Sequence, residues 1–179
     1  MSSIRISTRY AKSLLDLAKE QGKLDRVLAD INVFIGAANN HDLAMLLKSP
    51  IVPEGKKHQV MQALFGGTFD ATTIAFLRII VQKKREAFLP DIAQAFVEQY
   101  KTMKNITSAT LTSAAQLPDS TIADIKQRLL ADGIVTGDID MTVQIDPKLI
   151  GGFVLEFGDK RYDASVVHKL ETLRKEFAA

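Results

Sequence analysis

The chain has 179 residues, of which 46% are apolar and 25% are charged, and it contains no cysteine. This composition is typical of a globular protein rather than a disordered one, and it excludes disulfides, thiolate metal sites and cysteine nucleophiles. The sequence has no apolar stretch of membrane-spanning length and no apolar secretory signal or organellar presequence near its first residue. We therefore expect an intracellular protein of one or two domains.

The net charge of +2 hides an uneven distribution of charged side chains. Residues 1–104 carry 15 Lys and Arg against 10 Asp and Glu, whereas residues 105–179 carry 8 against 11. Opposite net charges indicate two surfaces that meet different partners. The overall charge is too small to favour nucleic acid, and no aromatic residue lies in a basic strand of the kind that binds single strands.

Apolar residues recur at helical spacing through residues 1–104 and predict six helices joined by short turns. The first helix ends before Gly22, and Asp42 is expected to cap the short third helix. Because no alternating strand pattern interrupts this region, the predicted fold is a six-helix antiparallel bundle. The five later helices are expected at about residues 24–38, 42–47, 53–65, 71–84 and 88–104.

The fifth predicted helix is apolar nearly all round, since only Arg78 is polar between Ile74 and Val81. One interpretation is a central helix enclosed by the others. The alternative is a helix with one face left open as a groove for an amphipathic helix of a partner. The basic run at residues 83–85 fits a solvated helix end that complements the helix dipole.

After residue 105 the spacing changes and predicts a small α+β domain over residues 105–179. Strands are expected at residues 106–114, 141–145 and 153–157, with a hairpin turn at 158–161. A helix is expected from Pro118-Asp119 to about Ala131, closed by Asp132-Gly133. A last helix from Ala164 to about Phe177 is expected to be capped by Asp163 and to bury Val166, Val167, Leu170 and Leu173.

The glycine pair Gly151-Gly152 lies between two predicted strands. Two adjacent glycines permit a bulge or a backbone approach that a Cβ atom would block. A purely structural bulge and a binding role both remain open at this point.

Motifs for catalysis are absent from the sequence. It has no phosphate loop, dinucleotide fingerprint, nucleophile elbow or zinc-binding His-Glu-x-x-His. The three histidines, at 41, 58 and 168, are isolated and expected at the surface or at helix caps. The acidic residues Asp138, Asp140 and Asp146 fit a solvated edge better than a metal cage. We expect no catalytic residue, no cofactor and no metal site.

Two stretches resemble the carboxyl-terminal signature of the ATP synthase delta subunit family, whose mitochondrial counterpart is the oligomycin-sensitivity-conferring protein. They are Ile145-Asp146-Pro147-Lys148-Leu149-Ile150-Gly151-Gly152-Phe153 and Gly158-Asp159-Lys160-Arg161-Tyr162-Asp163-Ala164-Ser165-Val166. Tyr10-Ala11-Lys12-Ser13-Leu14-Leu15 resembles the family's first helix, and Ser49-Pro50-Ile51 followed by Lys56 or Lys57 resembles the segment before its fourth helix. The resemblance covers essentially the whole chain, in order.

The resemblance implies a non-catalytic stator subunit of a rotary F-type ATP synthase. Residues 1–104 would bind the amino-terminal segments of the alpha subunits on the catalytic head, and residues 105–179 would bind the b subunits of the peripheral stalk. The subunit would lie at the cytoplasmic face of a bacterial cell membrane, associated with it only through the complex. By keeping the catalytic head from turning with the rotor, the subunit would couple proton flow to ATP synthesis.

The family's helix-binding groove, on the first and fifth helices, implies candidate residues for the head contact; which of them face the groove rather than the core is open. They are Tyr10, Ala11, Leu14, Leu15, Ile74, Leu77, Arg78 and Val81. For the stalk contact we expect Leu149, Ile150, Gly151, Gly152, Val166 and Leu170. A generic two-domain adaptor is the alternative, and an RNA-binding module is disfavoured because residues 105–179 are acidic.

Overall fold

The computed structural model describes residues 3–131, 137–158 and 160–177. The chain folds into two compact units, Met1–Tyr100 and Lys101–Ala179. The predicted fold class is confirmed: a region of six helices precedes an α+β part built on a four-stranded mixed sheet.

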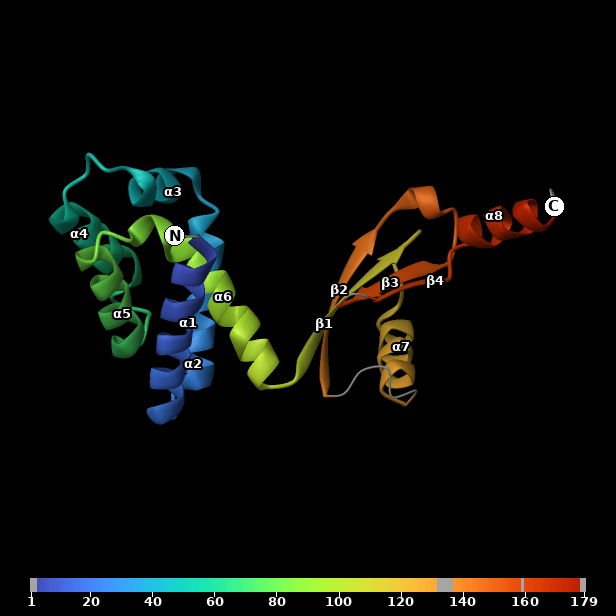
Figure 1. Cartoon of the computed structure of the whole chain (residues 1–179), viewed down its shortest axis with the longest axis horizontal. Coiled ribbons are helices and arrows are strands. Elements are labelled where there is room, and N and C mark those ends of the chain that lie inside the picture. The colour runs from blue at the N-terminus through green and yellow to red at the C-terminus, as the bar shows by residue number, and fades with distance from the viewer. Residues whose placement is uncertain (1–2, 132–136, 159, 178–179) are drawn as a thin grey trace. The chain divides into compact units, whose positions relative to one another are not determined.

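The helices of the amino-terminal unit follow the predicted order (Figure 1). The third begins under a different cap from the predicted one, because the Asn40 side chain accepts a hydrogen bond from Asp42 N at 2.8 Å. Asp42 therefore lies in the first turn rather than at the cap. The elements are α1 (Ser3–Glu20), α2 (Leu24–Ala38), α3 (His41–Lys48), α4 (Glu54–Phe65), α5 (Ala71–Gln82), the 3₁₀ turn η1 (Glu86–Phe88) and α6 (Leu89–Met103).

The apolar faces of these helices meet in one core. Phe65 joins α4 to α2 and to the turn before α5, since its ring lies 5.7 Å from that of Phe34 and 4.6 Å from that of Phe69. Burial of such side chains is the main favourable contribution to folding. The largest fully buried apolar side chains of this unit are Leu14, Val27, Ile31, Phe34, Leu47, Ile80, Leu89, Ile92 and Phe96.

A buried carboxylate fixes the start of α5. Asp30, on α2, is 3% exposed, and its Oδ2 accepts hydrogen bonds from Asp70 N and Thr73 Oγ1, both at 2.8 Å. The first N–H groups of a helix have no partner within the helix and attract negative charge. Asp30 satisfies one of these groups and so ties the amino end of α5 to α2.

The carboxyl-terminal unit is a sheet with strand order β2-β1-β3-β4. Strand β1 pairs parallel with β2 and antiparallel with β3, and β3 pairs antiparallel with β4. Its elements are β1 (Ile106–Ser113), α7 (Asp119–Ala131), β2 (Asp138–Ile145), the 3₁₀ turn η2 (Pro147–Leu149), β3 (Phe153–Phe157), β4 (Lys160–Asp163) and α8 (Val166–Phe177). The predicted helix end at residues 132–133 lies outside the described residues.

Two predicted boundaries in this sheet were wrong. Strand β2 starts at Asp138 rather than 141, because Asp138 pairs with Ile106 at the start of β1. Lys160 and Arg161 belong to β4 and not to the turn, since Lys160 pairs with Phe157. Pairing with a neighbouring strand, rather than local propensity, sets both limits.

Helix α7 packs on one face of this sheet. Alternate residues of β1, β2 and β3 point to the same side, and Leu129 of α7 packs among them. The buried cluster consists of Ala109, Leu111, Leu129, Ile139, Leu155 and Phe157.

The prediction for the last helix was wrong in two respects. Helix α8 begins at Val166, and Ser165 Oγ, not the Asp163 carboxylate, accepts the hydrogen bond from His168 N, at 3.2 Å. Its apolar positions are not buried, since Val166 is 39% and Leu170 is 55% exposed. The helix leaves the sheet instead of packing on it (Figure 1).

Replacing Asp30 is expected to destabilise the amino-terminal unit. Asp30→Ala leaves Asp70 N and the Thr73 hydroxyl without their acceptor, which we expect to lower the free energy of unfolding by about 3 kcal/mol. Urea denaturation followed by circular dichroism measures this change. Asn32→Ala, at an exposed position of the same helix, serves as the control and should stay within about 0.5 kcal/mol of the original. Equal effects of the two changes would contradict the prediction.

Asp70 is expected to make stability pH-dependent. A hydrogen bond from the Lys23 ammonium at 2.9 Å, with a second from Thr72 N, lowers the pKa of Asp70 from 3.8 to about 2. Because the folded pKa is lower than the unfolded one, the ionised group stabilises the fold above about pH 4, and this contribution is lost as the pH falls to about 2. The difference in thermal midpoint between the wild type and Asp70→Asn should shrink across that range. A constant difference would contradict the assignment.

Candidate protein-binding surfaces

Three of the four candidates on α1 lie in the core. Ala11 is 0%, Leu14 1% and Leu15 7% exposed, so they contribute packing and present almost no surface. Tyr10 is half-buried, and its ring lies 5.9 Å from the guanidinium carbon of Arg85, within the range of a cation–π contact. This contact links α1 to the segment that follows α5.

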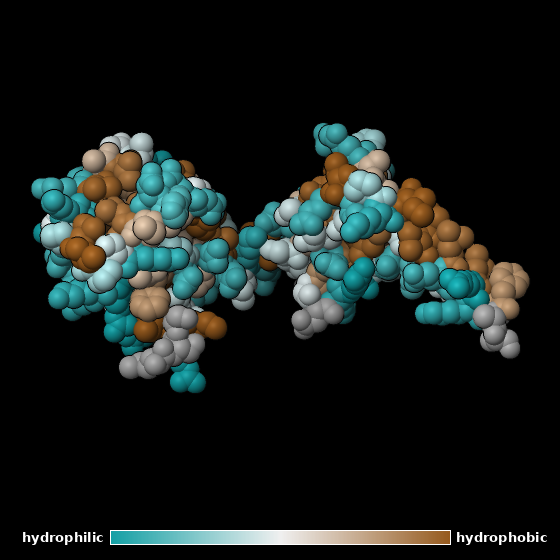
Figure 2. Space-filling model, turned by 90° about the horizontal axis from the view of Figure 1, so that it is seen from above, coloured by the Kyte–Doolittle hydropathy of each residue, from teal (hydrophilic) through white to brown (hydrophobic). Residues whose placement is uncertain are grey.

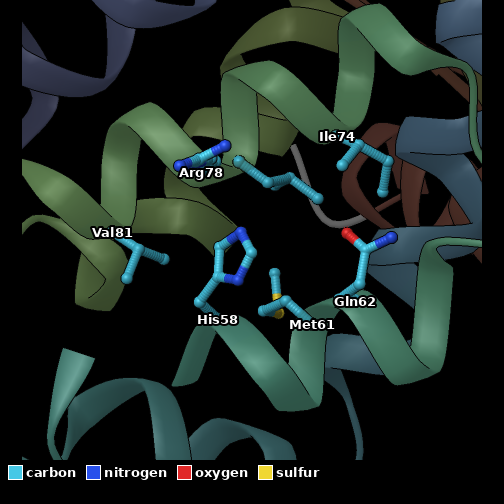
Figure 3. Close-up of a pocket in the computed structure, with 7 residues that line it drawn as sticks. His58, Met61, Gln62, Ile74, Arg78 and Val81 are labelled. Atoms are coloured by element: carbon cyan, nitrogen blue, oxygen red, sulfur yellow. The ribbon is translucent and has the colours of Figure 1, made fainter. Parts of the chain in front are cut away.

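The four candidates on α5 lie together on one groove between α5 and α4. Figure 3 shows Ile74, Arg78 and Val81 on α5 facing side chains that rise from α4. Leu77 also lines the groove, but Leu77 and Val81 are only 3% and 2% exposed. The complete lining is His58, Met61, Gln62, Ile74, Leu77, Arg78 and Val81.

The groove has an apolar floor and polar edges. Met61, Leu77 and Val81 form the buried floor, whereas Gln62 and Arg78 are exposed. The floor is almost closed, since Met61, Leu77 and Val81 are 4%, 3% and 2% exposed. The accessible part of the groove is therefore the half-buried Ile74 with the exposed Gln62 and Arg78.

The sequence left open whether α5 is enclosed, and the structure shows a helix buried on one side only. Thr73, Phe76 and Ile80 are buried, while Ile79 is 48% exposed. The α4 side of the groove was missed. His58 was expected at the surface or at a cap, and Gln62 gave no signal, because the contact between α4 and α5 is tertiary and leaves no mark on local spacing.

In the carboxyl-terminal unit, the structure brings the candidate residues of the loop and the last helix together. Val166 N donates a hydrogen bond to Gly151 O at 2.9 Å, which places the first turn of α8 on the glycine pair. Ile150 is 75% exposed beside this contact, and Leu170 follows one turn along α8. Leu149 and Gly151 are half-buried and Gly152 is exposed.

An unpaired apolar stripe runs along α8. Leu173 and Phe177, which are 47% and 88% exposed, lie at the helical spacing that continues Val166 and Leu170. Figure 2 shows hydrophobic surface along this helix. We call Val166, Leu170, Leu173 and Phe177 the α8 stripe. Exposed apolar patches of this kind mark sites of contact with other proteins.

The shifted pKa values belong to contacts that hold helices in place. Hydrogen bonds with Ser165 lower the pKa of Asp163 at the start of α8. Burial, together with the hydrogen bond to Asp25, raises the pKa of Tyr100, which joins α6 to α2. Within the described ranges, no three His, Asp or Glu side chains gather as metal ligands would.

None of the helices formed by residues 3–131, 137–158 and 160–177 combines the length and the apolar character needed to cross a membrane.

Comparison with known proteins identifies the family. Residues 6–177 match the family described as ATP synthase delta (OSCP) subunit. The chain is 36% identical to ATP synthase subunit delta of Cytophaga hutchinsonii, over 99% of this chain and 96% of the relative. It is 33% identical to the subunit of the same name from Chlorobium phaeobacteroides, over 97% and 96%.

A solved structure shares the fold. A chain of the Toxoplasma gondii mitochondrial ATP synthase hexamer superposes with a TM-score of 0.71 at 23% identity, covering 97% of both chains. The match over residues 6–177 and the full-length bacterial relatives show that this chain belongs to the ATP synthase delta (OSCP) subunit family, the non-catalytic stator subunit of F-type ATP synthases.

Proposed function

We propose that this subunit joins the catalytic head to the peripheral stalk through two separate surfaces. The amino-terminal unit binds amino-terminal segments of the alpha subunits, and the carboxyl-terminal unit binds the b subunits, with the division at about residue 104. The observation that carries this proposal is that each compact unit has a candidate surface of its own. In one unit it is the shallow α4–α5 groove, where Ile74 is half-buried and Arg78 is exposed, and in the other it is the exposed α8 stripe.

The chain is part of the ATP synthase complex, and the proposal places it at the cytoplasmic face of a bacterial cell membrane. Its attachment to the membrane is indirect, through the stalk. By holding the head still while the rotor turns, the link makes proton flow drive ATP synthesis.

Such a joint must not release under torque. Binding in the nanomolar range corresponds to about −12 kcal/mol, and a few well-buried anchors supply most of such an energy. The side chains of the α8 stripe are suited to this role, because they are the apolar surface that burial by a partner would remove from water.

A generic adaptor outside energy conversion is the alternative. It would have the same two surfaces but would not co-purify with alpha and b subunits. Isolation of the full-length chain from cells, followed by identification of bound subunits, separates the two functions.

Changing the accessible lining of the α4–α5 groove should weaken head binding. Ile74 is half-buried and lines the groove, and it suits this test better than Leu77, whose 3% exposure means that a polar change would also damage the core. Ile74→Lys is expected to weaken binding of the full-length chain to isolated catalytic head at least about tenfold. Calorimetric titration measures the affinity.

The matched control for that change is Ile79→Lys, on the same helix, 48% exposed and outside the groove. It should change the affinity for the head by less than about threefold. If Ile79→Lys weakened binding and Ile74→Lys did not, the partner would lie on another face of α5 and the groove assignment would be wrong.

A charge in the α8 stripe should weaken stalk binding. Leu170→Asp removes an apolar contact worth about 1.4 kcal/mol when the exposed half of the side chain is buried, which corresponds to about tenfold in affinity. Thr172→Asp adds the same charge at an exposed position outside the stripe and should bind b subunits nearly as the wild type does. Equal losses in the two variants would show a general charge effect and contradict the assignment.

A further inference from the structure

Residues 149–153, which lead into β3, and residues 163–166, which lead from the end of β4 into the first residue of α8, lie against each other. We call these two segments the α8 bracket. Ala164 N donates to Phe153 O, and Val166 N donates to Gly151 O, both at 2.9 Å. Two backbone hydrogen bonds therefore connect residue pairs that are 11 and 15 positions apart in the sequence.

Glycine is required where these segments meet. Gly152 has φ +80°, and a Cβ atom there would lie 2.4 Å from Ala164 O and 3.0 Å from Ser165 Cα. Both neighbours are backbone atoms, so neither moves away without displacing the start of α8. At Gly151 a Cβ atom would meet only the Val166 side chain, with Cγ2 at 3.1 Å.

Ile150 adopts a backbone conformation that is rare for its type. Its φ of 62° and ψ of −40°, with Gly151 N donating to Leu149 O at 2.6 Å, describe a tight three-residue turn of the strained kind with positive φ. A β-branched residue seldom occupies positive φ. Because its side chain is 75% exposed, burial within this chain does not account for Ile150 at this position. Residues held under such strain cluster at functional sites.

The ends of the strained turn are anchored. Asp146 N donates to Ser113 O of β1 at 2.8 Å, and the Asp146 carboxylate accepts from Lys148 N at 3.0 Å. Ile150 N donates to Pro147 O at 3.2 Å. The turn is therefore tied to the sheet on one side and to α8 on the other.

The first turn of α8 is held equally firmly. Ser165 is 1% exposed, its N–H donates to the Asp163 carboxylate at 2.9 Å, and its Oγ accepts from His168 N. Beyond this turn nearly every residue of α8 is exposed. The direction of the helix is therefore set at its first turn and not by packing along its length.

We propose that the α8 bracket is a rigid joint that fixes the direction of α8 and presents Ile150 beside the α8 stripe as one preformed surface for the stalk. Gly152 is the positioning residue, and Ile150 is a contact residue. A surface ordered before binding loses less conformational entropy on association. This inference rests on the proposed function, since it assigns the stalk as the partner.

The test measures the direction of α8 in the full-length chain. Because the sequence contains no cysteine, Thr142→Cys on β2 and Arg174→Cys on α8, both exposed, allow a pair of spin labels to be placed without background labelling. Pulsed electron resonance should give a narrow distance distribution in the otherwise unchanged chain. Gly152→Ala should broaden and shift it, and should weaken binding to purified b subunits at least about tenfold.

Gly158→Ala is the matched control. Gly158 also has positive φ, at +53°, but a Cβ atom at this position would meet nothing within 4 Å. It carries the backbone strain without the collision, so the distance distribution should stay narrow and stalk affinity should change by less than about threefold. Ile150→Gly removes the side chain and also suits the positive φ of this position. Because hydrogen bonds hold the turn on both sides, this variant should keep the narrow distribution and still weaken stalk binding.

If Gly152→Ala does not fold, Gly151→Ala takes its place as the test variant. A Cβ atom at residue 151 meets only the flexible Val166 side chain, so Gly151→Ala should shift the distance distribution in the same way but by less. A broad distribution in the otherwise unchanged chain, or a narrow unshifted one in both glycine variants, would overturn the joint. If Ile150→Gly bound the stalk fully, Ile150 would lose its role. The distance distribution could be narrow in the unchanged chain and broad in Gly152→Ala while the unchanged chain fails to bind the stalk. That result would refute the proposed function but would still support the rigid joint.

Discussion

The hydrogen bonds of the buried Asp30 carboxylate are the contact on which the amino-terminal unit depends. They hold Asp70 N and the Thr73 hydroxyl, and so they fix where α5 begins. The Lys23–Asp70 ion pair at 2.9 Å supports the same helix end from the surface. Successive side chains of a helix point in regularly changing directions around its axis. The position of the first turn therefore also sets which residues of α5 face α4. The Asp30 hydrogen bonds and the packing of Phe65 against Phe34 and Phe69 together position the two helices that line the groove.

In the carboxyl-terminal unit, backbone hydrogen bonds fix the start of a helix, α8. Its last helix exposes the apolar side chains that helices usually bury, and a helix of this length gains little stability by itself. The Ser165 cap, the hydrogen bond from Ser165 N to the Asp163 carboxylate and the contact with Gly151 hold its first turn instead. The exposed stripe is what remains available to a partner. Both units therefore combine a locally fixed helix with an apolar surface left open.

The errors of prediction share one cause. Asn40 caps α3 where Asp42 was predicted, and Ser165 caps α8 where Asp163 was predicted. In both cases two neighbouring polar residues fit the same motif, and backbone geometry chose between them. Predicting that β2 starts at Asp138 would have required knowing that it pairs with β1. The exposed stripe of α8 could not be foreseen, because an apolar helical face has the same spacing whether this chain or another protein covers it.

Periodicity along the sequence determined the six helices and three of the four strands that the structure describes, because these depend on neighbouring residues and on spacing. The division of charge follows from the count of charged residues along the chain. The signature around Gly151-Gly152 also identified the family from the sequence. Only the tertiary structure decided that Leu14 and Leu15 are core, that Ile74 and Arg78 meet α4, and that Val166 and Leu170 face solvent. Burial is a property of what lies opposite a side chain, and residues distant in sequence supply that surface.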